Sequence, residues 1–170
     1  MMDLKKVLIR KGVKKDLPDV LRLIRELAEY EKALAEVEVT LGELEDDGFG
    51  QNRIFEFYVA VNGKEVTGMA LYYTKYSTWQ GRCIFLDDIV VSEKYRNKGI
   101  GTRLFEAIIH EAIKRKVKRL EWQVLDWNLP AIKFYKKYDS LFLKEWLTCR
   151  LTEKQLLVLE RKRSTLINFK

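Results

Sequence analysis

A buried strand that leads through a short glycine-containing turn into an amphipathic helix occupies the middle of the sequence. Residues 82–91, RCIFLDDIVV, are mostly apolar over the length of a strand, and residues 101–116 repeat apolar side chains at helical spacing. A further strand-like segment follows at residues 119–127. A strand, a helix and a second strand in this order are typical of a right-handed parallel crossover, whose helix covers one face of the sheet. The pattern therefore predicts an α/β protein with a mixed sheet.

The segments on either side predict more strands and helices around this unit. Two strands should form a hairpin with Asn62-Gly63 at the turn, and Asp16 and Asn128 are placed as N-caps of helices. The predicted order is β-α-α-β-β-β-α-β-α-β, with helices on both faces of the sheet. The predicted strands are 6–12, two within 53–76, 82–91, 119–127 and 141–151, and the predicted helices are 17–28, 40–50, 101–116 and 128–138.

Length and composition indicate one globular domain. The chain has 170 residues, 47% of them hydrophobic, and no repeat or low-complexity linker divides it. We expect a domain at 1–151 and an extension at 152–170, which is either a helix that packs in a dimer or a segment of unknown role. Apolar runs are too short for a transmembrane helix, and the first residues lack the pattern of a signal peptide, so a cytoplasmic location is expected.

Histidine and cysteine are too scarce for several common kinds of active site. The chain has one histidine, His110, and two cysteines, Cys83 and Cys149, which lie far apart in the sequence. These residues cannot supply a zinc site or a Ser-His-Asp triad, so no metal is expected and most hydrolase mechanisms are excluded.

The formal net charge of +7 raises nucleic acid as a partner, but the local distribution of charge argues against it. Residues 26–47 contain nine acids and one base, a local net charge of −8 that would repel phosphate and attract a cationic ligand. The basic runs at 114–119 and 161–163 lack interleaved aromatic residues for base stacking. We expect no binding to nucleic acid or membranes, and we interpret the basic runs as solvated surface.

The turn itself, Tyr95 to Thr102 (YRNKGIGT), has the residues of an anion site. A helix N-terminus presents unpaired backbone N–H groups and the positive end of the helix dipole. Gly99 and Gly101 leave room for a phosphate and allow unusual backbone angles, while Arg96 and Lys98 can add charge-assisted contacts. A pyrophosphate would fit, and a plain helix start is the alternative. The spacing matches neither a P-loop nor a dinucleotide fingerprint.

Two spaced motifs resemble the GNAT superfamily of N-acetyltransferases. Arg-x-x-Gly-x-Gly resembles its acetyl-CoA pyrophosphate loop, and DWNLPAIKFYKK (126–137) is similar to its Asn-x-x-Ala-x-x-x-Tyr segment. The segments LRLIRELAEYEK, DGFG, YYTKYSTWQGR and FLDDIVV resemble the diamine acetyltransferase family more closely. Where polyamine enzymes of that family carry Asp-Pro-Trp, this chain has Ser77-Thr78-Trp79, a form that resembles the thialysine branch.

The resemblance implies a role for each part of the site. Asp87 would be the base that takes a proton from the amine through ordered water, and Tyr135 would protonate the departing thiolate. Strand alternation places Asp87 and Asp88 on opposite faces, so only one of them can face the substrate, and the sequence does not decide which one. An electrostatic role for Asp87 and core packing for Tyr135 are the alternatives. The residues implied to bind acetyl-CoA are Ile89, Val91, Arg96, Asn97, Lys98, Gly99, Ile100, Gly101, Thr102, Asn128 and Tyr135.

The acceptor would be a small cationic amine. Besides Asp87, the residues expected to bind it are Trp79, through a cation–π face, Tyr76, and acids near the end of the first helix that include Glu29 and Glu31. The leading hypothesis is direct acetyl transfer in a ternary complex to a thialysine- or lysine-like side chain. A polyamine or diamine acetyltransferase, a protein N-terminal or lysine acetyltransferase, an acyl-CoA sensor and a nucleic-acid-binding module are the alternatives. The resemblance also implies a homodimer.

The helix that carries Tyr135 ends differently from that of the family. A glycine follows this helix in the family, whereas this chain reads KKYDS at residues 136–140. Aspartate can adopt left-handed backbone angles at some cost, so Asp139 is the residue expected to turn the chain.

Overall fold

The computed structural model describes residues 7–167, with side chains through residue 163. The chain divides into two compact units, and the boundary in the sequence is after Gln123. The first unit contains β1 (Val7–Lys11), α1 (Leu17–Tyr30), α2 (Leu41–Phe49), β2 (Glu56–Asn62), β3 (Glu65–Ser77), β4 (Gly81–Val91), α3 (Ile100–Lys114) and β5 (Arg119–Glu121). The second contains α4 (Leu129–Lys136) and α5 (Glu153–Ile167).

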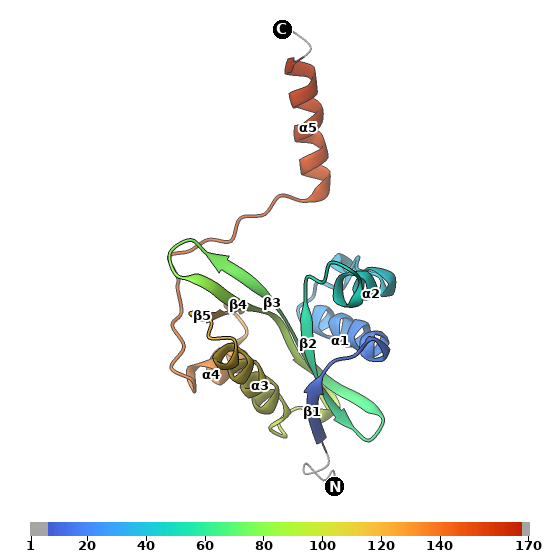
Figure 1. The fold of residues 1–170 in the computed structure, drawn as a ribbon, viewed down its shortest axis with the longest axis vertical. Helices are drawn as coiled ribbons and strands as arrows, with labels where there is room; N and C mark the ends of the chain where they lie inside the picture. Colours follow the sequence, from blue (N-terminus) through green and yellow to red (C-terminus); the bar gives the residue numbers. More distant parts are fainter. Residues whose placement is uncertain (1–6, 168–170) are drawn as a thin grey trace. The chain divides into compact units, whose positions relative to one another are not determined.

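The five strands form one mixed sheet in the order β1-β2-β3-β4-β5. The first four strands pair antiparallel, and β4 pairs with β5 in parallel on either side of α3, as the crossover pattern predicted. In Figure 1, α1 and α2 cover one face of this sheet and α3 covers the other. The prediction of helices on both faces is therefore confirmed for this unit.

Each face of the sheet has its own apolar layer, because successive side chains of a strand point to opposite faces. Val59, Met69 and Leu71 pack in a core cluster with Leu17 and Val20 of α1. On α3, the side chains of Ile100, Leu104, Phe105 and Ile108 are fully or almost fully buried. These spacings of three and four residues form one helical face, which explains why the periodicity of residues 101–116 predicted the helix.

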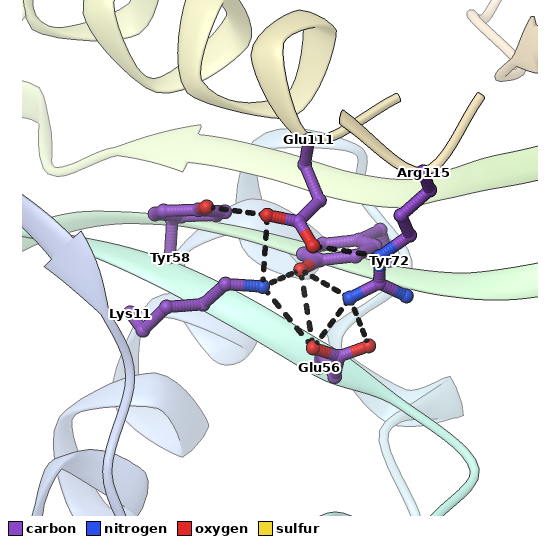
Figure 2. Close-up of polar contacts among 6 residues, drawn as sticks. All are labelled: Lys11, Glu56, Tyr58, Tyr72, Glu111 and Arg115. Atoms are coloured by element: carbon purple, nitrogen blue, oxygen red, sulfur yellow. Dashed lines mark hydrogen bonds and ion pairs between the residues drawn. The ribbon is translucent and has the colours of Figure 1, made fainter. Parts of the chain in front are cut away.

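A network of six polar side chains joins the C-terminal end of α3 to the sheet (Figure 2). Arg115 donates from Nη2 to both carboxylate oxygens of Glu56, at 2.6 and 2.7 Å, and from Nε to Glu111 at 2.6 Å. Lys11 lies 3.3 Å from Glu111 and donates a hydrogen bond to Tyr72, and the hydroxyl of Tyr58 donates to Glu111 at 2.9 Å. We call these residues the six-residue network: Lys11, Glu56, Tyr58, Tyr72, Glu111 and Arg115.

Two local predictions about the first unit need correction. Asp16 precedes α1 but does not cap it, because its carboxylate binds Arg10 at 2.6 and 2.9 Å and accepts the Val13 N–H. The hairpin loop consists of Gly63 and Lys64, with Asn62 paired to Glu65 as the last residue of β2. The start of α1 and the hairpin were both predicted at the right place. The prediction missed Arg10 as the partner of Asp16, and it missed the register of the hairpin by one residue.

The predicted last strand is absent. Residues 141–151 form no strand, and Leu141, Leu143 and Leu147 are exposed. Alternating apolar residues favour a strand only where a sheet edge can pair with them, and β5 itself is only three residues long. The extension does contain a helix, α5, whose start has reciprocal hydrogen bonds between Thr152 and Gln155. Whether α5 packs in a dimer stays a prediction, as does the domain boundary after residue 151.

Candidate active site

A β-bulge interrupts β4 at the pair of aspartates. Leu71 of β3 lies opposite Asp88, whereas the next residue, Tyr72, lies opposite Leu86, so Asp87 has no partner in the register. A bulge adds one residue to a strand and re-aims the side chains next to it. Strict alternation therefore does not apply between Asp87 and Asp88, and the expectation that they point to opposite faces loses its basis.

Two carboxyl groups, those of Asp87 and Glu31, lie close enough to Asp88 to influence its ionisation. Asp88 is partly buried, and burial together with the charges of Asp87 and Glu31 raises its pKa to about 6. Burial also raises the pKa of Asp87 and of Glu31, the residue that follows α1. In the part of the chain that the structure describes, none of the three has an ion-pair partner. We call Glu31, Asp87 and Asp88 the acidic cluster.

The two aspartates of the cluster lie on β4, the strand that leads into the glycine-containing turn. This turn has the backbone of an open helix start. Gly99 is the N-cap of α3, with a left-handed φ of 74°, and a Cβ built on it would contact nothing within 4 Å. Asn97 is also left-handed, with φ of 58°. Gly101 is already helical, and a Cβ there would meet only Val91 Cγ2 at 3.8 Å. The need for glycine backbone angles, predicted for both glycines, therefore applies to Gly99 alone.

Basic side chains flank this helix start. The Nε of Arg96 donates to the carbonyl oxygen of Val91 at 3.0 Å, and the ammonium of Lys98 donates to the carbonyl of Lys94 at 2.8 Å. Both cations are thus held by backbone oxygens. The backbone N–H groups of the first helical turn have no partners within the helix, so this end of α3 suits a phosphate group.

The edge of β4 offers backbone groups next to the same turn. β5 pairs only with Cys83, Ile84 and Phe85, so the part of β4 that contains Ile89 and Val91 has β3 as its one strand partner in the described residues. An unpaired strand edge can hydrogen-bond an extended amide-containing ligand. Acetyl-CoA has such a chain next to a pyrophosphate, so the β4 edge and the α3 start fit its two parts.

Two residues expected near the amine lie at the other end of the β3–β4 hairpin. The side chains of Tyr76 and Trp79 are 75% and 85% exposed. Tyr76 is opposite Arg82, which is six residues from Asp88 and therefore about 20 Å away along the strand. The structure does not bring Tyr76 or Trp79 to the acidic cluster within one chain.

Glu29 and Glu31 were predicted together as acids near the end of the first helix, but the structure separates them. Of these two glutamates, only Glu31 affects the ionisation of Asp88. Glu29 lies within α1 and is exposed, whereas Glu31 is the residue that follows the helix and is partly buried. Only the tertiary structure identifies Glu31 as the glutamate that acts on Asp88.

The second unit contains the other two predicted site residues. Asn128 caps α4, with Oδ1 accepting the N–H of Ala131 at 3.2 Å, as predicted. Tyr135 is 5% exposed and its ring packs edge-on against Phe134, with centroids 5.2 Å apart. Asp139 has φ of 51°, so an aspartate does take the left-handed position expected after this helix.

A strand, an open glycine turn and a helix start are the parts expected of an acetyl-CoA-binding fold, and the sequence places the chain in that class. Residues 18–139 match the acetyltransferase (GNAT) family, and the chain belongs to this family. It is an acetyl-CoA-dependent N-acetyltransferase, and the predicted fold class and enzyme class are both confirmed.

Named relatives refine the comparison. The chain is 39% identical over 153 residues to thialysine N-epsilon-acetyltransferase of Mus musculus, covering 84% of this chain and 90% of the relative. It is 34% identical over 159 residues to spermidine/spermine N(1)-acetyltransferase-like protein 1 of Homo sapiens, covering 88% of this chain and 23% of that protein. The solved structure of an integron cassette protein from the mobile metagenome of V. cholerae superposes with a TM-score of 0.74 at 24% identity, covering 91% of this chain and 98% of that one.

Proposed function

We propose that this enzyme transfers the acetyl group of acetyl-CoA to the primary amine of a small thialysine- or lysine-like substrate, by direct attack in a ternary complex. The observation that carries the proposal is the acidic cluster, in which Glu31 and Asp87 act on the charge of Asp88 and none of the three has an ion-pair partner among the described residues. A bound ammonium group would relieve this repulsion. The identity to thialysine N-epsilon-acetyltransferase and the Ser77-Thr78-Trp79 sequence support this amine class.

A polyamine such as spermidine is the second candidate acceptor. The similarity to a spermidine/spermine N(1)-acetyltransferase-like protein supports it, as does the local charge of −8 at residues 26–47, which would attract a multiply charged amine. This chain has Ser77, however, at the position where polyamine enzymes of the family carry an aspartate, and for this reason we rank polyamines second.

The attacking amine must first lose a proton, because an alkylammonium has a pKa of about 10. We assign this task to the two aspartates of the cluster, with Asp87 exchanging the proton through water. A pKa of about 6 leaves Asp88 mostly ionised at pH 7 and makes it a stronger base than an ordinary aspartate. The nitrogen can then attack the carbonyl carbon, and the carbon–sulfur bond breaks as the tetrahedral intermediate collapses.

Acetyl-CoA supplies the activated acetyl thioester when bound. We assign the pyrophosphate to the turn of Arg96 to Thr102, which carries the guanidinium, the ammonium of Lys98 and the N–H groups at the start of α3. Ile89 and Val91 would pair with the pantetheine amides along the β4 edge, and the N–H of Ile89 would also stabilise the oxyanion. Asn128 would bind the pantetheine chain. No metal is needed for these steps.

Tyr135 is proposed as the acid that protonates the departing thiolate. A phenol with a pKa near 10 can donate to a thiolate whose conjugate acid has a pKa near 8.5 if the two are in contact in the transition state. Tyr135→Phe keeps the ring and removes the proton, so we expect kcat to fall about 100-fold with little change in KM for either substrate. Steady-state kinetics with thermal melts as a folding control would test this, and an unchanged kcat would leave Tyr135 with a packing role.

The acceptor class is tested by acetyl-CoA-dependent thiol release with thialysine, lysine, spermidine, putrescine and a peptide panel at equal concentrations. Thialysine should have the highest kcat/KM. A higher value for spermidine would assign the enzyme to the polyamine class, and turnover of peptides alone would replace the small-molecule proposal with a protein substrate.

We also propose that the enzyme is a cytoplasmic homodimer that binds neither nucleic acid nor membranes. The described helices include none with the length and apolar content needed to cross a bilayer. Because Tyr76 and Trp79 are far from the cluster of their own chain, a second subunit is one way in which they could reach an amine site. Size-exclusion chromatography with light scattering would give the mass in solution, and a monomer would contradict the proposal.

A further inference from the structure

Arg96, at the start of the glycine-containing turn, is held by neutral partners rather than by a carboxylate. Arg10, Arg22, Arg115 and Arg119 each form an ion pair with a carboxylate. Arg96 instead has two neutral partners. Its Nε donates to the Val91 carbonyl at 3.0 Å, and its guanidinium carbon lies 5.0 Å from the ring centroid of Tyr30.

These two contacts fix the guanidinium without neutralising it. A carbonyl at Nε sets the direction of the group along β4, and an aromatic ring on one face limits its rotation. A carboxylate partner would also hold the group, but would compete with an anionic ligand for its charge. Arg96 is only partly exposed, so the ring of Tyr30 adds order where solvent would otherwise leave a long side chain mobile.

Tyr30 is well placed for this task because it is the last residue of α1, a helix whose buried face is fixed against the sheet. Its neighbour Glu31 belongs to the acidic cluster. The end of α1 therefore contacts Arg96 through Tyr30 and acts on the charge of Asp88 through Glu31.

We propose that Tyr30 is a positioning residue that orients Arg96 for the pyrophosphate of acetyl-CoA. This inference rests on the proposed function, because it assigns the ligand of Arg96. It adds a residue from α1 to a site otherwise built from β4, the turn and α3. The ring face is the active part of Tyr30, and its hydroxyl is not required.

The test is a double-mutant cycle read by direct binding of CoA in titration calorimetry, which needs no amine substrate. Tyr30→Leu removes the ring face and should weaken CoA binding about tenfold, the upper part of the range for a partly desolvated cation–π contact. Tyr30→Phe keeps the face and should bind CoA within about twofold of the wild type. In an Arg96→Leu background, Tyr30→Leu should have no further effect, because the group that it orients is gone.

Steady-state kinetics separate positioning from a general disturbance of α1. Tyr30→Leu should raise KM for acetyl-CoA and leave KM for the amine unchanged, whereas a displaced helix end would also move Glu31 and raise both. Thermal melts identify a variant that does not fold, and in that case Tyr30→Phe and Arg96→Lys, which keeps the charge without the planar group, carry the test.

The outcomes are distinct. A wild-type chain that binds no CoA would overturn the proposed function and the inference together. Normal wild-type binding with additive effects of Tyr30→Leu and Arg96→Leu, or equal loss in Tyr30→Phe and Tyr30→Leu, would overturn the positioning role alone.

Discussion

The six-residue network and the acidic cluster are both built from ionisable side chains of the first unit, but their neighbours have opposite effects. Glu111 is almost fully buried in the network, and hydrogen bonds and charge from Arg115, Tyr58 and Lys11 lower its pKa to about 2 despite the burial. Asp88 is less buried, yet burial and two like charges raise its pKa to about 6.

The difference shows that hydrogen bonds and opposite charges outweigh the effect of burial at Glu111, whereas like charges add to the effect of burial at Asp88. In the network, each charge is matched by the opposite one, and the arrangement holds α3 against the sheet. The cluster keeps like charges together at a cost in stability, a feature typical of sites that bind a cation or exchange protons. The same contrast yields four predictions that test it.

The largest effect is expected from removing the charge of Asp88. Asp88→Asn should lower kcat/KM about 100-fold if the cluster deprotonates the amine, because general bases contribute about 10² or more to rate. The same change should raise the free energy of unfolding at pH 7, since it relieves like-charge repulsion. Amine kinetics and urea denaturation measure the two quantities on one preparation.

A variant that lost activity and stability together would show that Asp88 has a structural role, and would remove the contrast with the network. Asp19→Asn is the control, because Asp19 is a partly exposed aspartate in the first turn of α1, at the opposite end of the helix from Glu31, and its ion pair is with Arg22. It should leave activity unchanged.

Glu111→Gln should have the next largest effect, on stability alone. The substitution leaves Arg115 and Lys11 with Glu56 as their one shared carboxylate. We expect the free energy of unfolding at pH 7 to fall by about 2 kcal/mol. This is less than the usual cost of breaking a buried pair, because both cations are partly exposed. Urea denaturation would measure it. Glu45→Gln, which breaks the exposed pair with Lys14, should have a much smaller effect, because solvent screens that pair. Equal losses in the two variants would mean that the network has no special stabilising role.

The smallest effect is a shift in pH dependence. Activity should rise through an apparent pKa near 6 as the cluster loses its proton. Asp87→Asn removes one of the like charges that raise the pKa of Asp88, so the acidic limb of the remaining activity should move to lower pH, by up to about one unit. A pH profile of kcat/KM would record it, and an acidic limb that stayed in place would show that Asp87 does not act on Asp88.

Stability should depend on pH with opposite sign in the two regions. The pKa of Glu111 is lower in the folded state than in the unfolded chain, so its contribution is complete above about pH 4.5 and is lost as pH falls towards 2. The pKa of Asp88 is higher in the folded state, so its contribution to the unfolding free energy decreases as pH rises from about 4 to 6.

Much of the site could be predicted from sequence because its parts are local. Gly99 sits at a helix start that only a few neighbouring residues define, and the cap at Asn128 depends on residues three positions apart. The left-handed turn at Asp139 is also set within one short segment. The family motifs lie in these segments, so the resemblance and the local chemistry agreed.

Contacts between distant segments could not be predicted in this way. The six-residue network joins positions from 11 to 115, and no single window of the sequence contains a signal for it. The role of Tyr30 could not be predicted, because the apolar pattern of its helix indicates which side is buried but not which residue each side chain contacts. Residues 141–151 have the alternation of a strand, yet a strand also needs a partner edge, which is a property of the folded sheet.

The sequence by itself determined the acetyltransferase class, the strand–turn–helix unit and the glycine at the helix start, because each depends on short-range spacing and backbone chemistry. Only the tertiary structure decided that a bulge breaks the alternation at Asp87, that Glu31 rather than Glu29 acts on Asp88, and that Tyr30 stacks on Arg96. These facts depend on ladder register and on the direction in which a helix ends against a sheet, which long-range packing sets.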